Sequence, residues 1–64
     1  MPVKKVREAI REVEADGWYL ARRRGSHRQY KHPTKPSTVT IPGKPGDDLL
    51  PATYASIRKQ AGLD

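Results

Sequence analysis

The chain has 64 residues, of which Leu, Ile, Val and Phe account for only 11, or about 17%. A large hydrophobic core is therefore excluded, and one small domain over residues 1–64 is expected. Without cysteine it can form neither a disulfide nor a thiolate metal site, and its apolar runs, of at most four residues, are far too short to span a bilayer. The 13 Lys and Arg residues exceed the 7 Asp and Glu residues and give a net charge of +6. We expect a cytoplasmic protein that gains stability from a partner.

The first predicted element is an amphipathic helix over residues 2–15. Its apolar residues recur at spacings of three, four and three positions: Val3, Val6, Ile10 and Val13. Charged residues fill most of the other positions, and Lys4 can pair with Glu8 one turn later. Gly17 suits the left-handed conformation that ends such a helix.

Three strands are predicted next. Residues 18–23 and 28–32 pair as an antiparallel hairpin across a turn at Gly25-Ser26. Residues 38–41 alternate β-branched side chains and form the third strand. Two glycines, a proline and two acids between residues 43 and 48 indicate a flexible loop.

A second amphipathic helix is predicted after Pro51, with Gly62 as its cap. Its apolar stripe recurs at spacings of four, three and four positions: Leu50, Tyr54, Ile57 and Ala61. Both helices need the same face of the sheet to bury their stripes. The predicted fold class is therefore α+β, a two-layer sandwich with the order α-β-β-β-α.

The excess positive charge lies in one window, residues 22–44. This window contains no acid and seven basic residues, namely Arg22, Arg23, Arg24, Arg28, Lys31, Lys35 and Lys44. Such a block is the usual footprint of a nucleic-acid partner, because phosphate contacts and counterion release supply most of the affinity. The alternative is a solvated basic surface without a specific partner.

His27 is the candidate catalytic residue. A histidine can take or give a proton at neutral pH, and this one lies among cations that would hold a phosphodiester. RNA carries its own nucleophile, the 2′-hydroxyl group, so one base together with charge stabilisation is enough to cut it without a metal. The alternative is that His27 satisfies the turn or packs at the start of a strand.

His32 is expected to cap or pack rather than to catalyse. It lies five residues from His27, and this odd separation places the two rings on opposite faces of an extended strand. The two histidines should therefore share neither acid–base chemistry nor a metal ion. With no cysteine and no third histidine, we expect no zinc site.

The remaining polar and aromatic candidates have simpler interpretations. Ser26 lacks the orienting carboxylate of a serine hydrolase, and we expect it to donate a hydrogen bond to a phosphate or to cap the turn. Trp18, Tyr19 and Tyr30 are able to stack on unpaired bases. Core packing is favoured for Trp18 and Tyr30, since the chain has no phenylalanine.

Five segments together carry a family resemblance. They are residues 16–20 (DGWYL), 25–27 (GSH), 29–33 (QYKHP), 38–42 (TVTIP) and 53–63, which end in KQAGL. In this combination they resemble the HicA mRNA interferase toxins of prokaryotic toxin-antitoxin systems. The resemblance implies a double-stranded-RNA-binding-like fold, cleavage of mRNA without a metal or other cofactor, and inhibition by a HicB antitoxin. It places the family's catalytic histidine on His27.

The predicted function is therefore that of an endoribonuclease toxin of a type II toxin-antitoxin system, with His27 as general base or acid. The candidates for RNA and phosphate binding are Arg22, Arg23, Arg24, Ser26, Arg28 and Lys31. The predicted partners are mRNA and a HicB-type antitoxin in a hetero-oligomer, with no membrane. Two alternatives remain, a non-catalytic RNA-binding module that uses the same sheet and turn, and a small adaptor whose basic patch binds an acidic protein.

Overall fold

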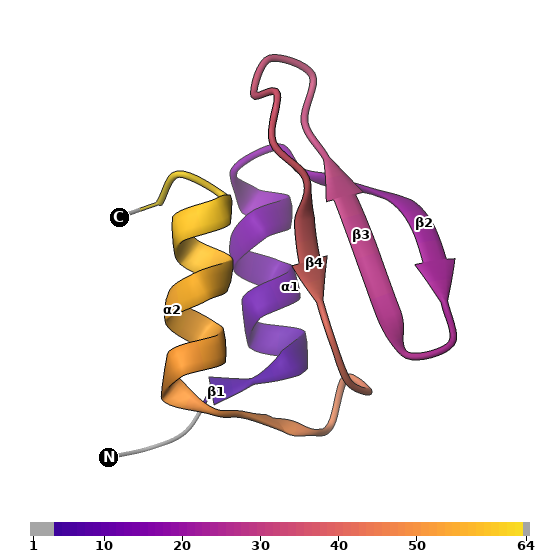
Figure 1. The fold of residues 1–64 in the computed structure, drawn as a ribbon, viewed down its shortest axis with the longest axis vertical. Helices are drawn as coiled ribbons and strands as arrows, with labels where there is room; N and C mark the ends of the chain where they lie inside the picture. Colours follow the sequence, from indigo (N-terminus) through magenta and orange to yellow (C-terminus); the bar gives the residue numbers. More distant parts are fainter. Residues whose placement is uncertain (1–3, 64) are drawn as a thin grey trace.

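Two helices lie side by side on one face of a three-stranded antiparallel sheet, as Figure 1 shows. The computed structural model describes residues 4–63. In chain order the elements are β1 (Lys4–Lys5), α1 (Val6–Ala15), β2 (Tyr19–Arg24), β3 (His27–Lys31), β4 (Val39–Ile41), β5 (Asp48–Leu49) and α2 (Pro51–Gln60). The order in the sheet is β2-β3-β4. The predicted α+β sandwich with the order α-β-β-β-α is confirmed, and β1 and β5 add a short second sheet.

The first helix begins later than predicted, because part of its expected first turn is a strand. β1 pairs antiparallel with β5, and residues 2–3 of the predicted helix lie outside the described residues. An ion pair of 2.5 Å between Lys5 Nζ and Asp48 Oδ1 joins the same two strands. The predicted pair of Lys4 and Glu8 is present at 3.9 Å.

The segment 43–48 is not the flexible loop that its composition suggests. Its last residue belongs to β5. The amide of Val6 donates a hydrogen bond of 2.9 Å to the Asp47 carbonyl, and the amide of Arg7 donates one of 3.0 Å to the Pro45 carbonyl. These two amides begin α1, where no partner exists within the helix itself. The segment therefore caps α1 with backbone carbonyls, a role that its two glycines and one proline do not reveal.

The core fills the space between the helices and the part of the sheet that they cover. Within residues 4–63 it consists of Val6, Ala9, Val13, Trp18, Tyr30, Val39, Ile41, Leu49, Ile57 and Ala61. Trp18 and Tyr30 are each only 2% exposed, which confirms their predicted core positions. Burial raises the pKa of the Tyr30 hydroxyl above its usual value, and the charge of Glu14 acts in the same direction.

The leucine that is buried just before the second helix is Leu49 and not Leu50, which was predicted to lie on the apolar stripe. Leu50 is 71% exposed, whereas Leu49 is buried. Leu50 has extended backbone angles and precedes α2, so its side chain does not continue the helical stripe. Because neighbouring residues of an extended segment project to opposite sides, exposure of Leu50 accompanies burial of Leu49.

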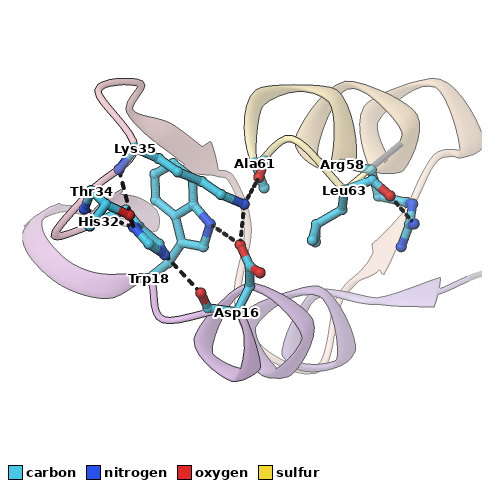
Figure 2. A network of polar contacts seen from close by, with 8 residues as sticks. All are labelled: Asp16, Trp18, His32, Thr34, Lys35, Arg58, Ala61 and Leu63. Atoms are coloured by element: carbon cyan, nitrogen blue, oxygen red, sulfur yellow. Dashed lines mark hydrogen bonds and ion pairs between the residues drawn. The ribbon is translucent and has the colours of Figure 1, made fainter.

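A polar cluster joins α2 to α1. Oε1 of Glu12 accepts hydrogen bonds from the Tyr54 hydroxyl at 2.7 Å and from Nη1 of Arg58 at 3.0 Å. Arg58 also donates to the Leu63 carbonyl at 2.6 Å, a contact drawn in Figure 2. Tyr54, predicted to lie on the apolar stripe, is therefore half-buried and contributes a hydrogen bond to a charged partner.

The end of α1 lies against the loop that follows β3. Gly17 has a φ angle of +103° and ends the helix as predicted. Its amide donates to the Glu14 carbonyl at 3.0 Å, and the amide of Trp18 donates to the Val13 carbonyl at 3.1 Å. A β-carbon on Gly17 would lie only 2.9 Å from Nε2 of His32, so glycine is required here by close approach as well as by its φ angle.

Figure 2 shows the polar contacts that hold this junction together. The Asp16 carboxylate accepts hydrogen bonds from Nε1 of Trp18 at 3.1 Å and from Nζ of Lys35 at 2.5 Å. Lys35 also donates to the Ala61 carbonyl at 3.0 Å. The hydrogen bond from Lys35 holds the pKa of the Asp16 carboxyl below its usual value, that from Trp18 acts likewise, and burial opposes both. One lysine thereby connects the ends of both helices.

Candidate nucleic-acid interface

The hairpin of β2 and β3 carries the candidate site. The two strands pair up to Arg24 and His27, so Gly25 and Ser26 alone form the loop. Gly25 has a φ angle of +59°, as a two-residue hairpin loop with glycine in first place requires. The predicted hairpin is confirmed, although each strand is displaced by one residue from its predicted bounds. The turn makes His27 the first residue of β3, directly opposite Arg24.

Strand pairing divides the side chains of the hairpin between two faces, because directly opposite residues of antiparallel strands project to the same side. Tyr30 is buried and pairs with Leu20 on one side and buried Val39 on the other, so this set faces the helices. The helix-side set consists of Leu20, Arg23, Arg28 and Tyr30. The opposite side, the outer face, consists of Tyr19, Arg22, Arg24, His27, Gln29 and Lys31.

A β-bulge in β2 decides which residues reach the outer face. The pairing shifts between Leu20 and Arg22 and leaves Ala21 without a partner on β3. In a regular strand the side chains alternate strictly, and counting from Arg22 would put Leu20 rather than Tyr19 on the outer face. The bulge therefore turns Tyr19 outward and Leu20 toward the helices.

Three of the predicted phosphate-binding residues share the outer face with His27, namely Arg22, Arg24 and Lys31. Residues directly opposite each other have Cβ atoms about 5 Å apart, which puts Arg24 beside His27. Ser26 is exposed in the turn next to His27. Because β2, β3 and β4 contain no Asp or Glu, no acidic side chain of the sheet reduces the positive charge of this face.

The other two predicted phosphate-binding residues, Arg23 and Arg28, pair with each other on the helix side. Nη1 of Arg28 donates a hydrogen bond of 3.0 Å to the Gly43 carbonyl. The arginine-rich segment is thus divided by its own alternation, and only half of it can contact a ligand that also contacts His27.

His27 has no structural partner within residues 4–63. Its side chain is exposed, and no hydrogen bond or ion pair to another described residue holds its ring. Both ring nitrogens are therefore accessible for proton transfer, and the neighbouring cations Arg22 and Arg24 suit a negatively charged reacting group. The ring of His27 therefore neither satisfies the turn nor packs at the start of β3.

His32, in contrast, is fixed on both ring nitrogens. Nε2 lies 2.8 Å from the Asp16 carbonyl and donates to it, while Nδ1 accepts from the amides of Thr34 at 3.1 Å and Lys35 at 3.2 Å. The ring also lies edge-on to Trp18, with 5.1 Å between centroids. The predicted structural role of His32 is confirmed.

Within residues 4–63, no group of three or more His, Cys, Asp or Glu side chains is arranged to hold a metal ion. No helix in this described part of the chain combines the length and the apolar character needed to cross a membrane.

One protein family matches nearly the whole chain. The family model described as the HicA toxin of bacterial toxin-antitoxin matches residues 6–63. The chain belongs to the HicA toxin family. The match contains the hairpin and both helices. No curated protein matches the chain. Membership of the HicA family gives the chain the role of a toxin in a toxin-antitoxin system and implies an antitoxin as its partner.

The predicted site of this HicA-family toxin omits two residues of the outer face. Gln29 is recognisable from sequence, because it alternates with His27 on one strand. Tyr19 is not recognisable as part of this face, because its position depends on the bulge at Ala21, for which the sequence carries no evident signal.

Proposed function

We propose that this toxin is a metal-independent endoribonuclease that cuts mRNA in the cytoplasm, with His27 as its general acid–base group and a HicB-type antitoxin as its inhibitor. The whole chain, residues 1–64, acts as one toxin domain. The observation that carries the proposal is the exposed, unpartnered ring of His27, opposite Arg24 on a face of the sheet without acids. A non-catalytic RNA-binding module would use the same cations and would have no need for such a ring.

The reaction uses the nucleophile that RNA itself supplies. His27 takes the proton of a 2′-hydroxyl group, whose oxygen attacks the adjacent phosphorus while the bond from phosphorus to the 5′-oxygen breaks. The products are a 2′,3′-cyclic phosphate and a free 5′-hydroxyl group, and the proton taken by His27 ends on the departing 5′-oxygen, directly or through water. Arg22 and Arg24 stabilise the additional negative charge that develops on the phosphate oxygens in the transition state.

The test compares the parent protein with the His27→Ala variant on a long RNA in excess EDTA. Loss of a general acid or base costs about 10²- to 10⁴-fold in rate, whereas truncation of an exposed residue changes stability by no more than about 0.5 kcal/mol. We therefore expect a folded variant that binds RNA and does not cut it. Replacing the 2′-hydroxyl at the cut position by hydrogen should block the parent in the same way.

Two results would contradict the proposal. A folded His27→Ala variant that cuts at the parental rate would show that the acid–base group lies elsewhere. A parent protein that binds RNA and leaves it intact in EDTA would support the non-catalytic module instead.

Inhibition by the antitoxin follows from the same face. The outer face carries three cations and no acid, so a partner with acidic residues at the contact would cover His27 and neutralise the face that holds RNA. Binding of such a partner to the folded toxin alone would also stabilise a domain with a small core. We expect the toxin–antitoxin complex to unfold at a higher temperature than the free toxin and to leave RNA uncut.

A further inference from the structure

Tyr19 is an exposed aromatic residue whose position the packing of the fold does not explain. Its side chain is 53% exposed and lies on the outer face opposite Lys31. The adjacent Leu20 is similarly exposed, at 47%, yet the bulge turns it to the helix side. An aromatic ring thus shares a face with His27, Arg22 and Lys31, while the neighbouring aliphatic side chain does not.

The outer face combines the two elements that bind single-stranded nucleic acids. Cations hold the phosphate backbone, and an aromatic ring supplies a surface on which a base can stack. Arg22, Arg24 and Lys31 provide the first element, and Tyr19 provides the second. Gln29, between the two ends of this face, adds an amide able to hydrogen-bond to a base edge.

The length of the face favours a single strand over a duplex. From His27 to Lys31 the strand rises about 13 Å, which equals roughly four base pairs at the spacing of a DNA duplex. A double-stranded-RNA-binding domain instead contacts about 16 base pairs across two minor grooves. In a duplex the bases also remain stacked on one another, so no base is available to Tyr19.

We propose that Tyr19 is a stacking platform for a nucleobase of single-stranded RNA, at the end of the outer face remote from His27. The inference rests on the proposed function, since it assigns a subsite to the same substrate. The stacked base belongs to a nucleotide near the cut and not to the one whose 2′-hydroxyl reacts, because Tyr19 lies opposite the last residue of β3 and His27 is the first.

The test measures binding of a fluorescent single-stranded oligoribonucleotide in the His27→Ala background, in which the RNA stays intact. Stacking of one base on an aromatic side chain is worth about 5- to 150-fold in affinity by alanine substitution. We expect Tyr19→Ala to weaken binding at least fivefold and Tyr19→Phe to stay within twofold of the parent. Leu20→Ala is the matched control, because it truncates an equally exposed neighbour on the opposite face, and it should also stay within twofold.

An abasic oligonucleotide of the same length and charge separates stacking from every other effect of the variant. Without bases, Tyr19→Ala and its parent should bind equally well within twofold, because only the phosphate contacts remain. Equal weakening on ordinary and abasic strands would overturn the proposal, and so would an equal loss from Leu20→Ala. A duplex that binds as tightly as the single strand, with the same dependence on Tyr19, would overturn it as well.

These outcomes are independent of the catalytic proposal. Because binding is measured without cleavage, a parent protein that fails to cut RNA leaves the result for Tyr19 intact. Conversely, if Tyr19→Ala leaves RNA binding unchanged and instead weakens the complex with an acidic partner protein, the ring belongs to a protein interface and the stacking platform is refuted, whereas cleavage by His27 would still stand.

Discussion

Replacement of Gly17 by alanine tests the close junction between α1 and the loop after β3. The backbone of Gly17 has a φ angle of +103°, which residues other than glycine rarely adopt. The added β-carbon would lie 2.9 Å from Nε2 of His32. This ring has little freedom to withdraw, since both of its nitrogens are hydrogen-bonded and one edge lies against Trp18.

The expected loss has two parts. Holding a residue other than glycine in a sparsely populated region of φ and ψ costs about 1–3 kcal/mol. Moving His32 away from the Asp16 carbonyl costs the hydrogen bond between them, or about 0.5–1.5 kcal/mol. Together they lower the free energy of unfolding by about 1.5–4.5 kcal/mol, from a total of roughly 3–10 kcal/mol for a chain of this length. The melting temperature should fall by roughly 6–36 °C.

Gly25→Ala is the matched control, measured alongside by urea and thermal unfolding with circular dichroism. Gly25 also has a positive φ angle, of +59°, yet an added β-carbon would have no heavy atom within 4 Å. This variant therefore bears only the backbone cost, about 1–2 kcal/mol. If Gly17→Ala were no less stable than Gly25→Ala, the contact with His32 would carry no energy and the reasoning would be refuted.

Two further results are expected. Because the Asp16 pKa is lowered in the folded protein, the ionised carboxylate stabilises the fold above its unfolded pKa near 4, and this stabilisation is lost as the pH falls through the lowered folded pKa. In urea titrations, the difference in unfolding free energy between the parent and Lys35→Met should therefore decrease from pH 7 to pH 3. An unchanged difference would contradict the contact between Lys35 and Asp16. The logarithm of the RNA association constant should fall with the logarithm of the salt concentration at a slope of about −2 if only the three outer-face cations contact phosphates, rather than about −5 for all seven basic residues of the window. In fluorescence anisotropy titrations, Arg22→Ala should make this slope shallower by about 0.7, and Arg23→Ala should leave it unchanged.

Local patterns in the sequence were sufficient for most of the fold. Gly17 reveals the end of the first helix because a left-handed cap has a strong residue preference, and Gly25 reveals the hairpin turn for a similar reason. Trp18 and Tyr30 could be placed in the core because few other large apolar residues are available to fill it. Each of these signals lies within a few residues of the feature that it predicts.

The features that escaped prediction depend on contacts between distant segments. β1 and β5 are only two residues long, and their pairing joins segments that lie more than 40 residues apart in the sequence. Leu49 and Leu50 are indistinguishable by type, and only the start of α2 decides which of them is buried. At the candidate site, alternation correctly groups His27 with Gln29 and Lys31, but it assigns Tyr19 to the wrong face, because alternation assumes a strand without a bulge.

β2 contributes no buried residue, since all six of its side chains are exposed and the helices cover the sheet from the side of β4 (Figure 1). Substitutions along this strand therefore cost little folding energy, in contrast to those in β4, where Val39 and Ile41 are fully buried. The outer-face side chains of β2 can thus change without disturbing the scaffold. Under the proposed function, a change in the preferred base would accumulate first at Tyr19, without any compensating change in the core.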